Sequence, residues 1–199
     1  MTSEHDDDPD LVLDPQVADE LDADPALAAA VLEIEGHVAE AGWDQGSRLF
    51  ALVDTAELLA REPALGRAMG LDDASAEGSL TPVEQDRLPE QQLERVLEGI
   101  VWPADVTGCA AVVERLVLPP DVDGQVPEEP AAAEEFAREH PDRQEVRIVA
   151  GVTRAGSSYC ALRMRSHDDA QSVVTGTDLV PGLLALLRTT LEDEESPHE

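Results

Sequence analysis

Hydrophobic residues in the first half of the chain recur mainly at helical spacing. The clearest stripe repeats every three or four positions: Leu27, Val31, Ile34 and Val38. Asp24 followed by Pro25 is typical of an N-cap with proline at the first helical position, and Gly42 suits the left-handed residue that ends a helix. We therefore predict a helix from Asp24 to about Ala41. The same Asp-Pro signature at residues 14–15 predicts another helix start.

The next stretch predicts a strand, a helix, a connection and a further helix. Arg48 to Val53 is apolar after its first residue, as in a buried strand, whereas Thr55 to Arg61 has the composition of a helix. A helix over residues 48–55 remains the alternative. Residues 70–90 are rich in Gly, Ser, Asp and Pro, which predicts a long connection. An apolar stripe then predicts a helix from about Pro89 to Gly99.

Branched apolar residues predict strands in the second half. Gly108 to Pro120 is rich in valine and stops at two prolines, where a strand cannot continue. The segments EVRIVAGVTR and SYCALRMRS are joined by residues 155–157, which include a glycine, and together they predict a β-hairpin. Residues 121–141 separate these strands and have the composition of an acidic linker, with a short helix from Ala131 to Glu139.

A last helix, capped by Asp178 and running from Leu179 to about Leu191, is apolar enough to lie across a sheet. The chain is therefore expected to be an α+β protein, with a helical N-terminal half and an antiparallel sheet of three to four strands packed by the C-terminal helix. We expect a single domain over residues 10–191. Residues 1–9 and 192–199 are expected to be disordered acidic tails.

Alternation across the hairpin divides its side chains between two faces. The core face carries Val146, Ile148, Ala150, Val152, Cys160, Leu162 and Met164. The opposite face carries Arg147, Arg163 and Arg165, which we expect to point to solvent.

Net charge excludes several classes of function. The chain has 44 acidic and 13 basic residues and a formal net charge of −31, and every basic residue is arginine. Without lysine the chain has no Schiff-base amine and no phosphate-loop lysine. A strongly negative field repels nucleic-acid phosphates and anionic lipids, so we expect neither direct nucleic-acid binding nor membrane binding.

Targeting signals and cysteine usage predict the compartment. The N-terminus has no basic region followed by an apolar one, and no apolar run approaches the roughly 18 residues of a spanning helix. Cys109 and Cys160 each lie in an apolar segment, which suits reduced core thiols better than a disulfide framework. We therefore expect a cytoplasmic protein.

The arginines of the hairpin are the most informative polar residues. Guanidinium groups bind carboxylates and phosphates in bidentate geometry, so Arg147, Arg163 and Arg165 could form a site for an anion or an acidic peptide. The alternative is that the arginines form cross-strand ion pairs with carboxylates such as Glu114 and Glu145.

A second candidate site follows the last strand of the hairpin. His167 and Asp168, between Ser166 and Asp169, bring an imidazole and carboxylates into one turn, as a metal site or a general base requires. An ordinary turn at the end of the strand explains the same residues. The chain contains no HExxH, CxxC, GxSxG, GxGxxG or GxxxxGK motif, so we predict no catalytic residues, no metal site and no cofactor.

Several stretches of the chain resemble a known family. They are GWDQGSRLFALVDTAELLAREP, GCAAVVERLVLPP, EVRIVAGVTRAGSSYCALRMRSHDD and DLVPGLLALLRTTL. Together they are similar to an actinobacterial family of small acidic proteins without assigned activity. The resemblance spans nearly the whole chain, and it implies no catalytic residues.

These observations favour a non-enzymatic protein that binds another protein or a peptide through the sheet, its edge or the arginine face. One alternative is the binding or turnover of a small anionic ligand near Arg147, Arg163, Arg165, His167 and Asp168. Another is an acidic mimic of nucleic acid. The sequence leaves the ligand, the partner and the oligomeric state open.

Overall fold

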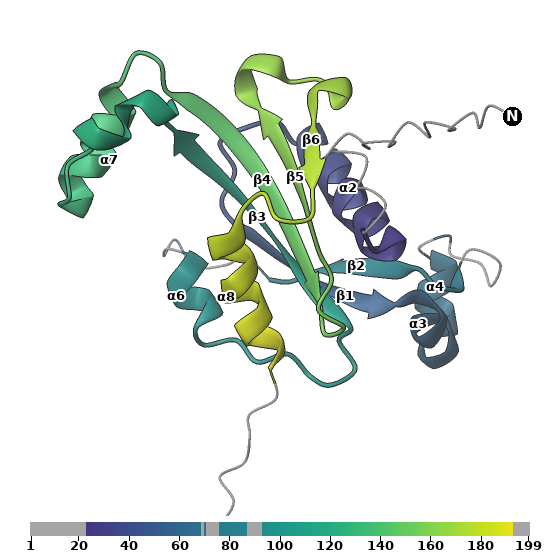
Figure 1. Cartoon of the computed structure of the whole chain (residues 1–199). Helices are drawn as coiled ribbons and strands as arrows, with labels where there is room; N and C mark the ends of the chain where they lie inside the picture. Colours follow the sequence, from purple (N-terminus) through teal and green to yellow (C-terminus); the bar gives the residue numbers. More distant parts are fainter. Residues whose placement is uncertain (1–22, 69, 71–75, 87–92, 193–199) are drawn as a thin grey trace, which may run out of the picture.

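A six-stranded sheet forms the centre of the molecule. The computed structural model describes residues 23–68, 70, 76–86 and 93–192. Every neighbouring pair of strands is antiparallel, and the order across the sheet is β2-β1-β3-β4-β5-β6 (Figure 1). The strands are β1 (Arg48–Asp54), β2 (Leu80–Glu84), β3 (Gly108–Val117), β4 (Gln144–Thr153), β5 (Ser158–Met164) and β6 (Val174–Gly176).

Helices cover both faces of the sheet. The α-helices are α2 (Pro25–Glu40), α3 (Thr55–Arg61), α4 (Pro63–Ala68), α6 (Leu93–Leu97), α7 (Pro130–Glu139) and α8 (Pro181–Leu191). The short 3-10 helices are η1 (Pro120–Gln125), η2 (Arg165–His167) and η3 (Ala170–Ser172). Helix α2 packs on one face, and α8 with α6 packs on the other (Figure 1). None of the helices in the described segments is long and apolar enough to cross a lipid bilayer.

The signals that predicted helix α2 act as expected. The Asp24 carboxylate accepts hydrogen bonds from the backbone N–H of Ala26 at 2.9 Å and of Leu27 at 3.3 Å. Gly42 has a φ of 80°, in the left-handed region that favours glycine after a helix. The strand followed by a helix at residues 48–61 is confirmed as β1 and α3. The signature at residues 14–15, the predicted N-terminal tail, residues 193–199 of the predicted C-terminal tail and residues 89–92 of the next predicted helix lie outside the described residues.

The predicted register of the hairpin is confirmed. Val146 lies opposite Met164 and Ile148 opposite Leu162, so the apolar side chains of β4 and β5 share one face. They join a core with Leu184 and other residues of α8 and α6. The opposite face forms a second core with α2, into which Val149, Phe50 and others project. The sheet is therefore buried on both faces.

The predicted number of strands, three to four, was too low. Strand β2 lies within residues 70–90, which were predicted as a connection because Pro82 and the surrounding residues are typical of turns. Strand β6 has only three residues, too short for a visible alternation. Because β1 and β2 both precede residue 100, the N-terminal half is also not purely helical. The coarser prediction, an α+β protein with an antiparallel sheet, is confirmed.

The last two helices differ slightly from the prediction. Helix α8 begins at Pro181, two residues later than predicted, and no side chain caps it, so the predicted cap by Asp178 was wrong. Proline at the first position removes one of the N–H groups that a cap would satisfy. The helix predicted from Ala131 to Glu139 is confirmed as α7, one residue longer at its start.

A glycine allows α2 to approach the sheet closely. A Cβ atom on Gly151 of β4 would lie 2.7 Å from a Val31 methyl carbon and 3.1 Å from one of Leu27. Both residues belong to the buried stripe of α2. The short distance between α2 and the sheet therefore depends on the presence of glycine at position 151.

We predict that Gly151→Ala lowers the free energy of unfolding by about 1 to 3 kcal/mol, because the added methyl group overpacks the contact with α2. Gly182→Ala in α8, where a Cβ meets nothing within 4 Å, is the control and should not lower stability. Urea denaturation of both variants measures the difference. Equal stabilities would show that α2 does not pack this closely.

Cys109 and Cys160 are free, and both are fully buried. Burial raises the pKa of the Cys109 thiol to about 11, from an ordinary value of 9.0, because the thiolate would lose its solvation. The thiol of the folded protein therefore stays protonated over a pH range in which the unfolded chain ionises.

We predict that Cys109 stabilises the fold below about pH 9 and that this contribution is lost as the pH rises towards about 11, since only the unfolded state then releases the proton. Urea denaturation across this range should show a steeper loss of stability for the wild type than for Cys109→Ala. Parallel curves for the two proteins would contradict the prediction.

Candidate functional site

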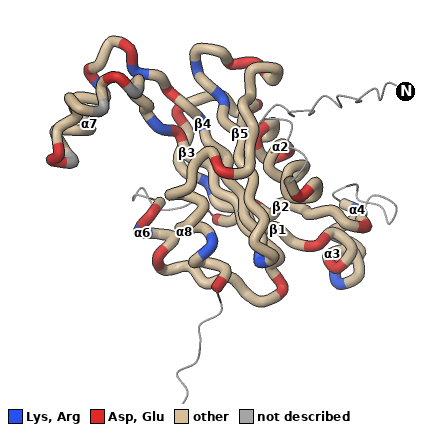
Figure 2. The backbone as a smooth tube through the Cα atoms, in the orientation of Figure 1, with Lys and Arg blue, Asp and Glu red and all other residues tan. Residues whose placement is uncertain are grey.

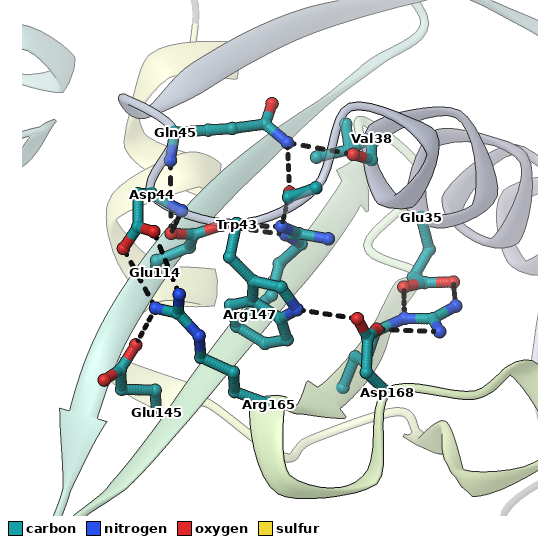
Figure 3. Close-up of polar contacts among 12 residues, drawn as sticks. Glu35, Val38, Trp43, Asp44, Gln45, Glu114, Glu145, Arg147, Arg165 and Asp168 are labelled. Atoms are coloured by element: carbon teal, nitrogen blue, oxygen red, sulfur yellow. Dashed lines mark hydrogen bonds and ion pairs between the residues drawn. The ribbon is translucent and has the colours of Figure 1, made fainter.

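Arg147 and Arg165 lie beneath the loop that follows α2, as Figure 3 shows. Arg163 contacts α2 itself through Glu35. Arg147 projects from β4, Arg163 from β5, and Arg165 begins η2. Arg147 is 1% exposed and Arg163 is 5% exposed. The prediction that this face is open to solvent was therefore wrong for these two residues, because α2 covers it.

Arg163 forms a buried bidentate ion pair with Glu35 of α2. Its Nε and Nη2 atoms lie 2.5 and 2.8 Å from the two carboxylate oxygens. Its Nη1 donates to Asp168 at 3.3 Å. The hydrogen bonds that Arg163 donates to Glu35 are the main cause that raises the pKa of Arg163, so the guanidinium group stays charged inside the protein. The pair joins α2 to the sheet.

Arg147 forms a second ion pair, with Glu114 of β3. Its Nη2 lies 2.7 Å from Glu114 Oε1 and also donates to the carbonyl oxygen of Gly42. The other Glu114 oxygen accepts the backbone N–H groups of Asp44 at 2.9 Å and Gln45 at 3.2 Å. One carboxylate therefore holds both the arginine and the loop after α2.

Trp43 of this loop lies against the arginines. Its ring centroid is 4.5 Å from Arg147 Cζ and 5.6 Å from Arg165 Cζ, distances typical of cation–π contacts. Its indole N–H donates to Asp168 Oδ2 at 2.9 Å. Trp43 therefore helps to shield the buried part of the cluster from solvent.

Arg165 occupies the outer rim and is half exposed. Both of its terminal nitrogens lie 2.9 Å from the Asp44 carboxylate, and Nη1 also lies 2.5 Å from Glu145. Hydrogen bonding to Arg165 lowers the pKa of Asp44, and these carboxylates raise the pKa of Arg165. Three guanidinium groups thus meet five carboxylates, those of Glu35, Asp44, Glu114, Glu145 and Asp168.

The structure therefore brings the predicted arginines and Asp168 together as an internal ion-pair network. The expected partners Glu114 and Glu145 are confirmed. Glu35 was missed, although it lies four residues after Val31 and three before Val38, on the buried stripe of α2. That position was the available signal for a buried charge. Trp43 and Asp44 gave no such signal, because their contacts depend on the path of a loop.

His167 stands apart from this network. Its Nδ1 lies 3.0 Å from the hydroxyl of Ser166, and the residue is exposed. The neighbouring Asp168 is directed to Trp43 and Arg163 instead. Across the described segments, no group of three or more His, Cys, Asp or Glu side chains is placed to hold a metal ion.

A groove with a mainly apolar lining lies between β3 and α7. Its volume is about 640 Å³. Its apolar lining consists of Leu116, Val117, Leu118, Val126, Ala133 and Ala137. Arg115 and Arg138 also line it. Leu116 is 38% and Val117 is 44% exposed, so two adjacent large apolar side chains of β3 are open to solvent at this groove.

One edge of β3 is open along this groove. Strand β1 pairs with β3 only as far as Val112, whereas β4 pairs with it as far as Val117 (Figure 1). The N–H of Thr153 bonds to Ser157 on the β5 side, so even-numbered residues of β4 face β3. Their partners are the odd-numbered residues of β3. The backbone groups of Glu114 and Leu116 consequently face away from β4, and no strand among the described residues pairs with them.

The outer edges of the sheet are less suited to pairing. Strand β2 carries Pro82, which lacks an N–H group, and β6 has only three residues. The free part of β3 has neither form of protection. It combines exposed apolar side chains with backbone groups that have no strand partner among the described residues. The carbonyl oxygen of Glu114 accepts a hydrogen bond from Arg115 Nη1 at 3.3 Å.

The fold and this surface define a protein built on an antiparallel sheet between helices, in which the polar cluster is an ion-pair network and an apolar groove adjoins an open strand edge. The chain belongs to the family of PPA1309-like proteins, whose model matches residues 27–192. No curated protein and no solved structure matches the chain.

We predict that Arg163→Gln lowers the free energy of unfolding by about 3 to 5 kcal/mol, because it leaves the Glu35 carboxylate buried without its partner. Arg165→Gln removes a solvent-exposed pair and should cost far less, because both charges stay solvated when they are separated. Urea denaturation of the two matched variants at neutral pH measures both values. Similar losses for both would mean that the Arg163 pair is not buried in solution.

Proposed function

We propose that the protein is a non-enzymatic domain that binds a protein or peptide partner in the groove between β3 and α7. The observation that carries this proposal is the coincidence of exposed Leu116 and Val117 with an open strand edge. Large apolar side chains gathered on a surface are typical of interaction sites. An unpaired strand edge supplies the directional hydrogen bonds that such sites use.

The arginine cluster supports this choice because its three guanidinium groups are already paired with carboxylates of the same chain. Arg147 and Arg163 are buried and paired, and Arg165 is shared between Asp44 and Glu145. An anionic ligand would have to displace the carboxylates that already pair with these guanidinium groups. Arg147 Nη1 has no hydrogen-bond partner among the described residues, but it is buried. The geometry therefore favours the groove over the earlier alternative of a small anionic ligand near the arginines.

The proposed location is the cytoplasm. Two buried free thiols suit a reducing compartment, in which disulfides are rare.

We predict that Val117→Asp abolishes capture of a protein partner by the immobilised full chain. A charge placed in an apolar contact should weaken binding at least about tenfold, since it costs more than 1.4 kcal/mol. Val101→Asp is the matched control, because Val101 is 56% exposed and lies outside the groove. Quantitative mass spectrometry of crosslinked complexes compares the two variants with the wild type.

Both substitutions are at exposed positions, so urea denaturation should give stabilities close to that of the wild type. A partner that is captured equally by Val117→Asp and the wild type would exclude the groove as the binding site.

A further inference from the structure

The free edge of β3 and the charge around it together indicate the kind of partner that fits. We propose that the partner contributes an extended, basic segment, which adds to β3 as a new strand alongside Glu114 to Val117. This inference rests on the proposed function and specifies how the groove is used.

The backbone of β3 supplies the pairing groups. The N–H and C=O groups of Glu114 and Leu116 point to the open side of the strand. An added strand would replace the hydrogen bond of 3.3 Å that the Glu114 carbonyl accepts from Arg115 Nη1. The open segment of four residues is about 13 Å long, at roughly 3.3 Å per residue. An added strand could therefore continue the ladder where β1 ends, as in other cases in which a peptide joins a sheet edge.

The side chains at this edge suit an extended segment. Successive residues of a strand point to opposite faces, so Leu116 and Val117 lie on either side of the added strand. The side chain of Leu116 is on the face of Glu114, and that of Val117 is on the face of Arg115. Helix α7 contributes Ala133 and Ala137 to the same groove. Apolar residues of the partner would therefore find apolar neighbours on the groove side.

The charge of the surroundings favours a basic segment. Exposed carboxylates gather on η1, on the turn before α7 and on α7 itself: Asp121, Glu128, Glu129, Glu135 and Glu139. Figure 2 shows acidic positions at both ends of α7. Arg138 is the only arginine on α7, and Arg115 is paired with Glu94 at 3.0 Å. The local field therefore attracts positive charge.

The same charge argues against a second copy of this chain as the occupant. Each copy would bring a formal net charge of −31 and its own acidic α7 to the contact. Like charges brought together at an interface oppose association. A partner of opposite charge gains from the same field in both the rate and the specificity of binding.

Synthetic peptides added to the full chain test this proposal. The probe is an eight-residue peptide with blocked ends in which valine and arginine alternate. One matched peptide has glutamate in place of arginine, and another carries a methyl group on every backbone nitrogen. We expect the first peptide to bind and to slow hydrogen exchange at the Glu114 and Leu116 amides, measured by NMR. The other two peptides should bind at least about tenfold more weakly, because each loses either the charge attraction or several hydrogen bonds.

Two substitutions at one position separate backbone pairing from side-chain contact. Leu116→Pro removes the outward N–H without removing a hydrogen bond to β4, whereas Leu116→Ala keeps it. The proline variant should bind the peptide at least about tenfold more weakly than the alanine variant. Unchanged exchange at Val113 and Arg115 would confirm that the pairing of β3 with β4 is intact in both.

In the peptide experiment, strand addition is overturned if no peptide binds, if the methylated peptide binds as well as the first, or if hydrogen exchange slows only away from β3. It is also overturned if the two Leu116 variants bind the peptide alike. Equal binding of the glutamate peptide would overturn the basic character of the partner. The groove itself is tested separately, because a partner lost with Val117→Asp would still support the proposed function after any of these results.

Discussion

The position of α2 on the sheet is the constraint on which the rest of the structure depends. The buried pair between Arg163 and Glu35 joins the helix to β5, and the missing side chain of Gly151 lets the helix approach closely. Breaking such a pair leaves a buried charge without compensation, so the helix has a strong preference for this one placement. The loop after α2 then passes over Arg147, and Trp43 covers the remaining charge.

This placement also explains how a strongly acidic protein uses its few basic residues. The hairpin arginines form ion pairs with carboxylates that α2, β3 and the loop after α2 bring to the sheet. A buried carboxylate without a cation would be costly, so the arginines are needed where the fold buries acidic groups. The remaining carboxylates stay on the surface, where they are solvated and produce the negative field that any partner meets.

The sequence predicted the elements that depend on local patterns. Capping at Asp24 and the alternation along β4 and β5 were sufficient to place α2 and the hairpin, because each signal lies within a few residues. Strands β2 and β6 could not be predicted in this way. Pro82 is compatible with an edge strand only once its neighbour β1 is known, and three residues of β6 carry no periodicity.

The candidate site shows the same division between local and long-range information. Alternation grouped Arg147 and Arg163 on one face, but it could not reveal that α2 covers that face. The covering of this face by α2 depends on the pairing of Arg163 with Glu35, a residue 128 positions earlier in the chain. The groove was equally hidden, since the exposure of Val117 depends on the point at which β1 stops pairing with β3.

The end of β1 therefore has consequences beyond the sheet. Had β1 begun a few residues earlier, its backbone would pair with Glu114 and Leu116, and the edge of β3 would be closed. The loop after α2 instead contacts the Glu114 carboxylate, which accepts the backbone N–H groups of Asp44 and Gln45. Proteins usually protect strand edges, because an open edge can pair with other chains. An edge left open beside exposed apolar residues, in a protein that protects its outer edges with Pro82 and a short β6, fits a surface kept for a partner.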